Sequence, residues 1–222
     1  MSPEDALREL EGSRVGECHL SLGRVKSGRT QEEAYFALYL SCPGGRSEKP
    51  VVEGLYRRSG EGGVGSWVEF RYRPAVTFPG GVVLDLEKAS RTRELFLDLK
   101  GLVGPGGAFH VVYGAESHPF FQETERGLKL GFPPPLTPLG KVLWECGFRW
   151  FKDWYFPEGW LEGSMKLQAT LPLDAKAASQ REEEAWSEVR AFLRRVDEGM
   201  VEQGELLERA LARARELRLM PG

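Results

Sequence analysis

Two carboxylates stand out as side chains that could move a proton. Asp85 and Glu87 are two residues apart in an expected strand, 81–87, so their side chains should point to the same face. A carboxylate held beside a reacting group can act as a general base. The alternative is that both are ordinary polar residues at a strand edge. The pattern alone leaves both interpretations open.

A polar, basic turn follows these carboxylates and opens the next expected helix. Its members are Ser90, Arg91, Thr92 and Arg93. A hydroxyl at a helix start can cap the backbone amides, and cations there attract an anionic ligand. The alternative is a capped helix start whose arginines are solvated.

Two further groups could contact a substrate. Glu116 and His118 lie at the end of an expected strand, 108–116, and could line a pocket for an acceptor. Trp154 and Tyr155 belong to residues 141–160, which hold four of the six tryptophans. Because large rings bury much apolar area, core packing is the favoured interpretation of this segment. A stacking platform for a ligand or nucleic acid, aided by Arg149 and Lys152, is the alternative.

The first part of the chain is typical of a β-sheet. In residues 66–73, Val68, Phe70 and Tyr72 alternate with polar or partly polar side chains. In residues 33–42 both faces are largely apolar, which predicts a central strand covered on both sides. Turn residues separate the expected strands, which are 17–25, 33–42, 51–58, 66–73 and 81–87.

From residue 88 the periodicity becomes helical and then alternates with strands. Leu95, Phe96 and Leu99 indicate a helix, which the glycine-rich run 104–107 stops before the strand 108–116. A long connection, 117–137, follows and is either a lid or a surface loop. Thr137 and Gly147 are typical of the start and end of the next helix. A hairpin, 148–171, closes this part, which predicts an α/β (α+β) fold with a mixed, largely antiparallel sheet.

The order strand, helix, strand, helix, strand, strand over residues 81–171 resembles the second half of the Gcn5-related N-acetyltransferase fold. The helix ending "GKVLWECGFRWFK" resembles that superfamily's Tyr-Glu-x-x-Gly-Phe pattern. Residues 108–171 are also similar to an uncharacterised prokaryotic family, domain-of-unknown-function family 1122.

The resemblance implies an acyl-coenzyme A-dependent N-acyltransferase that uses acetyl-coenzyme A or another acyl-coenzyme A. In that interpretation Asp85 or Glu87 is the base, residues 90–93 hold the cofactor, and the amine or small-molecule acceptor is unknown. The sequence departs from the family in two places: "EKASRTRELF" lacks the glycines of the pyrophosphate loop, and the tyrosine position falls near Leu143. A non-catalytic binding or assembly module on the same scaffold is therefore the alternative.

The last part of the chain predicts two amphipathic helices. We expect an acetyltransferase-like domain at 1–172 and a helical extension at 173–222, broken near Gly199 and Gly204. The apolar stripes of these helices should pack either on their own sheet or on a second copy. The spacing of the second stripe favours a homodimer.

Composition sets further limits. The net charge of −3 and pI of about 5.8 argue against general binding to nucleic acid or to an anionic membrane. No apolar run is long enough to cross a bilayer, so a cytoplasmic protein is expected. The three cysteines are odd in number and widely spaced, and only three histidines are present, so we expect neither a disulfide framework nor a metal site.

Overall fold

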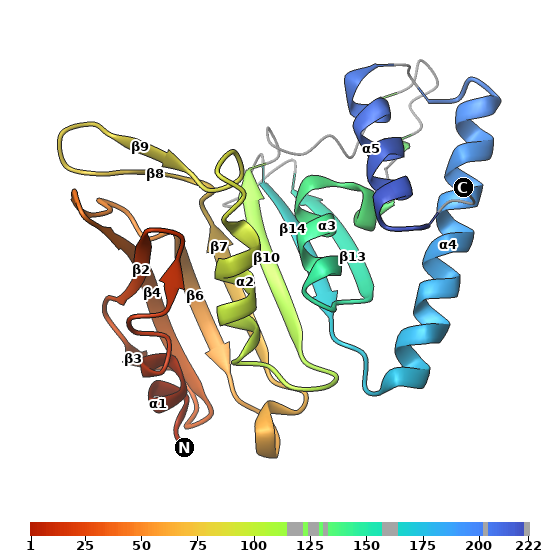
Figure 1. Cartoon of the computed structure of the whole chain (residues 1–222). Helices are drawn as coiled ribbons and strands as arrows, with labels where there is room; N and C mark the ends of the chain where they lie inside the picture. The colour runs from red at the N-terminus through yellow and green to blue at the C-terminus, as the bar shows by residue number, and fades with distance from the viewer. Residues whose placement is uncertain (115–121, 124–128, 131–132, 157–163, 202–203, 220–222) are drawn as a thin grey trace.

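The computed structural model describes residues 1–114, 122–123, 129–130, 133–156, 164–201 and 204–219. Within these residues, ten strands form one mixed sheet, which Figure 1 shows with helices lying against it. Its main strands, in spatial order, are β1 (Arg14–Val15), β2 (Cys18–Leu22), β4 (Glu33–Cys42), β6 (Val52–Arg57), β7 (Trp67–Tyr72), β10 (Ala108–Gly114), β14 (Ser164–Thr170) and β13 (Trp150–Phe156). The short strands β3 (Lys26–Ser27) and β5 (Gly45–Arg46) also pair with β4. All described pairs in this sheet are antiparallel except β7 with β10. The mixed, largely antiparallel fold is thus confirmed.

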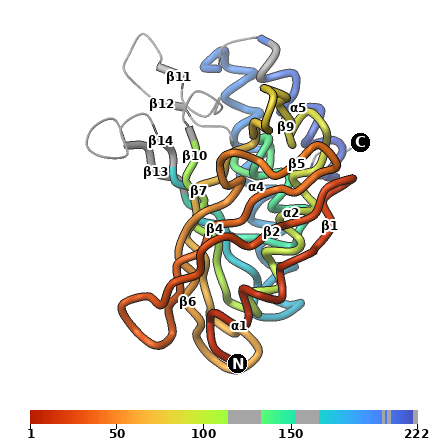
Figure 2. The backbone as a smooth tube through the Cα atoms, turned by 90° about the vertical axis from the view of Figure 1, so that its left-hand side faces the viewer, coloured from red at the N-terminus to blue at the C-terminus, as the bar shows by residue number. Residues whose placement is uncertain are grey.

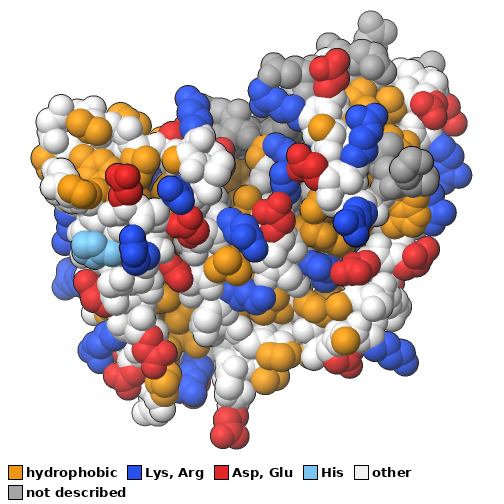
Figure 3. All heavy atoms as spheres, viewed as in Figure 1, with side chains coloured by type: hydrophobic (Ala, Val, Ile, Leu, Met, Phe, Trp, Pro, Cys, Tyr) orange, Lys and Arg blue, Asp and Glu red, His pale blue; other side chains and the backbone are white. Residues whose placement is uncertain are grey.

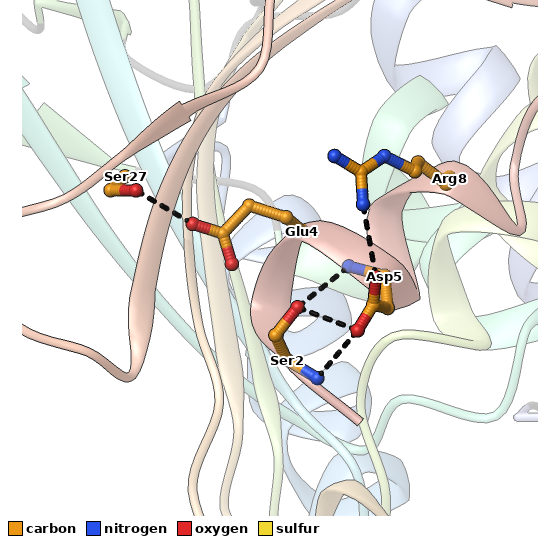
Figure 4. Close-up of polar contacts among 5 residues, drawn as sticks. All are labelled: Ser2, Glu4, Asp5, Arg8 and Ser27. Atoms are coloured by element: carbon orange, nitrogen blue, oxygen red, sulfur yellow. Dashed lines mark hydrogen bonds and ion pairs between the residues drawn. The ribbon is translucent and has the colours of Figure 1, made fainter.

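The first helix, α1 (Pro3–Arg8), begins with a capping box. The Ser2 hydroxyl accepts the Asp5 backbone N–H at 3.1 Å, and the Asp5 carboxylate accepts the Ser2 backbone N–H at the same distance, as Figure 4 shows. Glu4 turns outward from this helix and accepts a hydrogen bond from Ser27 of β3. The capping box sets the start of the helix at Ser2, and the hydrogen bond to Ser27 ties the helix to the sheet.

The strand expected at 81–87 is shorter and lies elsewhere. β9 (Val83–Asp85) pairs with β8 (Ala75–Thr77) as a separate two-stranded ribbon. The parallel crossover through α2 (Thr92–Lys100) therefore connects β7 to β10, not 81–87 to β10. The prediction was wrong because a local alternation marks a strand but does not identify its partner.

The described helices cover one face of the main sheet, as Figure 2 shows in the view along its edge. The large buried side chains between sheet and helices include Tyr56, Phe70, Phe96, Phe109 and Phe148. Phe96 of α2 meets Phe70 and Tyr72 edge to face. This cluster holds α2 against β7.

The other face of the sheet has no described helix over it. On β4 the residues Ala34, Phe36, Leu38 and Leu40 are buried, whereas Tyr35 of the opposite face is 43% exposed. The expectation that β4 is covered on both sides is therefore wrong within the described residues. The prediction failed because tyrosine and alanine occupy the outward positions, so the sequence pattern is largely apolar on both faces.

The second half of the core follows the expected local signals. A short 3₁₀ helix, η3 (Pro134–Leu136), leads into α3 (Pro138–Glu145), and the Thr137 hydroxyl accepts the Gly140 backbone N–H at 3.1 Å. Gly147 ends the helix with φ of +98°, and β13 and β14 form the predicted antiparallel hairpin. The short strands β11 (Gln122–Glu123) and β12 (Lys129–Leu130) pair with each other inside the long connection.

The C-terminal region forms two helices, as predicted. They are α4 (Ala175–Asp197) and α5 (Glu205–Glu216), and Figure 1 shows them at the β13 side of the sheet. Arg181 of α4 donates to the Arg149 carbonyl at 2.8 Å, and Arg213 of α5 donates to the Leu136 carbonyl at 2.9 Å. Their buried side chains, which include Val189, Phe192, Leu207 and Ala210, join the main core. Both helices thus dock within one chain, while the homodimer stays a prediction.

A disulfide joins Cys18 of β2 to Cys42 of β4, contrary to the expectation drawn from the cysteine spacing. The antiparallel register pairs His19 with Ser41 and so brings the two flanking cysteines to a Cα–Cα distance of 4.3 Å. A sequence separation of 24 residues concealed this proximity. Disulfides are rare in a reducing cytoplasm, so this bond weighs against the expected location.

Candidate functional site

An open cleft lies where the β8–β9 ribbon, α2, α3 and α5 come together. Its volume is about 750 Å³. The residues that line it are Asp85, Glu87, Lys88, Ser90, Thr92, Arg93, Pro138, Leu139, Lys141, Val142, Glu145, Arg209 and Arg213. It therefore combines a set of cations with several carboxylates and a small apolar floor. Figure 3 shows the helix-bearing face, over which acidic and basic side chains are interspersed.

The two predicted carboxylates both reach this cleft, although only one of them lies in a strand. Asp85 is the last residue of β9, and its carboxylate accepts the backbone N–H groups of Glu87 and Lys88 at 3.0 and 3.1 Å. These bonds fold the chain into a turn that carries Glu87. Asp85 thus positions the turn, and Glu87 is the carboxylate left accessible to a ligand.

The surroundings of Glu87 favour its neutral form. Desolvation by the cleft walls raises the pKa of Glu87, the nearby Asp85 raises it further, and Arg213 acts in the opposite direction. The side chain remains accessible from solvent, so screening limits the size of this effect. A carboxylate with a raised pKa is better matched to proton transfer near neutral pH than an ordinary one.

The predicted anion-binding turn divides into residues that face the cleft and one that does not. Ser90, Thr92 and Arg93 line the cleft. Thr92 is buried and exchanges a hydrogen bond of 2.8 Å with the Tyr72 hydroxyl. The Arg91 guanidinium instead donates to Glu94 at 2.7 Å, and Glu94 also accepts the Gly16 amide. The Arg91 side chain therefore bonds toward the end of β1 and not into the cleft.

The C-terminal helix supplies cleft residues that the sequence did not reveal. Arg209 and Arg213 lie one turn apart on α5 and face the cleft together with Lys141 of α3. Burial lowers the pKa of Arg213, as does the neighbouring Arg209. Lys141 also bonds to Glu216 of α5 at 2.5 Å. The i, i+4 spacing of the two arginines was visible in the sequence, but the docking of α5 beside α3 was not.

The remaining predicted site residues are placed only in part. Glu116 and His118 lie outside the described residues. Trp154 and Tyr155 belong to β13, where they pair with Lys166 and Met165 of β14, and their side chains lie outside the described part. Among the residues that the structure describes, no group of three or more His, Cys, Asp or Glu side chains could hold a metal ion. None of the described helices has the length and apolar character needed to cross a bilayer.

The fold and the cleft define an α+β protein with helices on one sheet face and a charged cleft at the start of the crossover helix. A family model described as "Protein of unknown function (DUF1122)" matches residues 16–196. The chain belongs to this family. The crystal structure of a protein of unknown function from Aquifex aeolicus is similar, with 25% identity, a TM-score of 0.64, and coverage of 97% of this chain and 98% of that chain. No curated protein matches.

Proposed function

We propose that this protein is an acyl-coenzyme A-dependent N-acyltransferase and that its scaffold is related to the Gcn5-related acetyltransferases. The observation that carries the proposal is the cleft at the start of α2, which gathers Asp85, Glu87, Ser90, Thr92 and Arg93. The succession β7, α2, β10, α3, β13, β14, with β7 parallel to β10, supports the proposed scaffold. These sequence-predicted residues converge although the crossover begins one strand earlier than expected.

The charge of the cleft suits a ligand that carries phosphates. Arg93, Lys141, Arg209 and Arg213 line it together with the first turn of α2. A guanidinium group can donate two parallel hydrogen bonds to a phosphate, and the backbone amides at a helix start favour an anion. These groups are proposed to hold the diphosphate of a coenzyme A ester in place of a glycine-rich loop.

The proposed reaction is direct transfer. The acceptor amine attacks the thioester carbonyl, the C–N bond forms, and the C–S bond breaks to release the thiolate. Glu87 takes the proton from the attacking nitrogen, because Asp85 is occupied by backbone N–H groups. The buried Leu143 cannot protonate the thiolate, so that proton comes from water or from the acceptor.

The alternative function is a binding or assembly module without catalysis. The absent glycine loop and the leucine at the tyrosine position favour it. The two functions differ in a measurable way, because a module binds its ligand without turnover. A panel of amines with acetyl-coenzyme A, followed through release of free thiol, separates them.

The proposal is tested by calorimetry and thermal shift with acetyl-coenzyme A. We expect the ligand to raise the melting temperature, because it binds the native state alone. Arg93→Ala should weaken binding, whereas Arg91→Ala is the matched control, since its guanidinium points to Glu94. Absence of heat and of a thermal shift at millimolar ligand would refute the proposal. Equal losses in the two variants would refute the assigned cleft.

If thiol is released, the base is tested next. Glu87→Gln should abolish transfer while retaining cofactor binding. Retained turnover in this variant would show that Glu87 is not the base.

A further inference from the structure

The sheet face that has no described helix over it carries aromatic and basic side chains together. By strand alternation and register it presents Tyr35 and Tyr39 of β4, Trp67 of β7 and Trp150 of β13. Tyr35 is 43% exposed, and the other three are partly exposed. Figure 2 shows the described helices on the opposite side of these strands.

The register places Trp67 and Trp150 in one row across the strands, and Tyr35 lies in the neighbouring row. One row runs from Arg57 through Trp67 and Ala108 to Thr170 and Trp150. The path from β4 to β13 crosses five gaps between strands, or about 24 Å at the usual spacing. Trp67 packs edge to face on His110 at 5.9 Å, which holds its ring in place. The aromatic positions thus form an extended track rather than a pocket.

On the described strands of this face, cations outnumber carboxylates, although the chain as a whole is acidic. The carboxylates on the described strands of this face are Glu33, Glu53 and Glu69. Each is paired with a cation: Arg57 at 3.9 Å, Arg73 at 2.6 Å and Lys166 at 2.6 Å, respectively. Further cations on the described strands of the same face are Lys26, Arg46 and Arg71.

Two of these cations, Arg46 and Arg71, lie where they could contact a ligand on this face. The Arg46 guanidinium lies 3.8 Å from the centre of the Tyr39 ring, a cation–π contact at the edge of the track. Arg71 is exposed in the central strand β7, and within the described part of the chain it has no carboxylate partner. Its charge is therefore available to an anion.

We propose that this sheet face binds single-stranded nucleic acid, with Tyr35, Trp67 and Trp150 stacking on bases and Arg71 contacting the phosphate backbone. Single-strand binding surfaces combine aromatic rings for bases with cations for phosphates. A second copy of the chain fits less well, because it would bring the same excess of positive charge to the interface. The net charge of −3 does not oppose the proposal, since binding depends on the local field. This site is separate from the cleft and does not depend on acyl transfer.

The test uses fluorescence anisotropy of the full chain with labelled oligothymidylate and oligouridylate of about 12 nucleotides, within the range of known single-strand sites. We expect saturable binding that quenches tryptophan fluorescence and weakens as salt rises from about 50 to about 200 mM. A duplex of the same length should bind more weakly, because its bases cannot stack on the track. Absence of binding at low salt, or equal binding of the duplex, would overturn the proposal.

Matched variants locate the site. Tyr35→Ala should weaken binding roughly tenfold, and Tyr35→Phe should retain it, because the ring remains. Arg71→Glu should weaken binding at least as much, whereas Arg195→Glu, the same charge change on the exposed surface of α4, should have little effect. Melting temperatures verify that each variant is folded. Equal losses for Arg71→Glu and Arg195→Glu would overturn the proposal, as would a dimer in sedimentation that Arg71→Glu dissociates.

Discussion

The hydroxyls of Tyr72 and Thr92 lie 2.8 Å apart in the core and join the end of β7 to the first residue of α2. Burial raises the pKa of Tyr72, and the hydrogen bond to Thr92 acts in the opposite direction. Thr92 also lines the cleft, so this bond fixes the helix start on which the candidate site is built.

Thr92→Val should destabilise the protein by about 1 to 3 kcal/mol, because it leaves the buried Tyr72 hydroxyl without its partner. Urea unfolding measures the change. In the double variant Tyr72→Phe/Thr92→Val the loss should be smaller than the sum of the two single losses. Additive losses would show that the two hydroxyls do not interact.

Gly147→Val should destabilise the protein by about 2 kcal/mol or more, since its φ of +98° disfavours a side chain with a Cβ. A Cβ built there would also lie 3.1 Å from the Lys100 Nζ atom. Gly44→Val is the control, because a Cβ at Gly44 meets nothing within 4 Å and its φ lies outside the range that L side chains avoid. Equal melting temperatures for the two variants would contradict the assigned helix end.

Reduction of the Cys18–Cys42 disulfide should lower the free energy of unfolding by about 3 kcal/mol, as expected for a loop of this length. Melting curves with and without a reducing agent measure the effect. The control is the double variant Cys18→Ser/Cys42→Ser, on which the reducing agent should have no effect. A wild type insensitive to reduction would mean that the bond is not formed in solution.

Glu87 should make stability depend on pH. Its folded-state pKa is raised above the ordinary 4.5, so protonated Glu87 favours the fold. This contribution is present below the unfolded-state pKa and is lost as pH rises through the folded-state pKa. Glu87→Gln should therefore melt above the wild type at pH of about 7, with the difference shrinking near pH of about 4.

Glu183→Gln is the control for this measurement, because its side chain is 77% exposed on α4. It should show no comparable gain at neutral pH. If Glu87→Gln melts below the wild type at neutral pH, the ionised carboxylate stabilises the fold and the assigned direction of its pKa shift is wrong.

Local signals predicted the fold wherever a short stretch determines its own structure. The cap at Thr137, the positive φ at Gly147 and the alternation in β7 depend on neighbours within a few residues. Such features can be predicted from one sequence because the residues that cause them are neighbours in the chain.

Long-range relationships could not be predicted in the same way. The Cys18–Cys42 bond follows from the register of β2 on β4. β9 lies outside the main sheet because it pairs with β8. In the cleft, Asp85 and Glu87 were predicted as site residues from their spacing. Arg213 was not predicted, because it reaches the cleft only when α5 docks on η3. Pairings of this kind depend on the packed chain rather than on local pattern.

The burial of Leu207 shows that α5 packs on its own chain, and a homodimer is a separate prediction. Leu207 is 2% exposed and belongs to the core of the same chain, so Leu207→Ala should destabilise the protein by about 2 to 5 kcal/mol. Leu97→Ala is the matched control, since Leu97 of α2 is 41% exposed and its loss should have little effect. If the protein is a monomer, the melting temperature of the wild type should not change with protein concentration. A melting temperature that rises with concentration, together with a sedimenting species heavier than one chain, would instead support the predicted homodimer, because association stabilises the folded state by mass action.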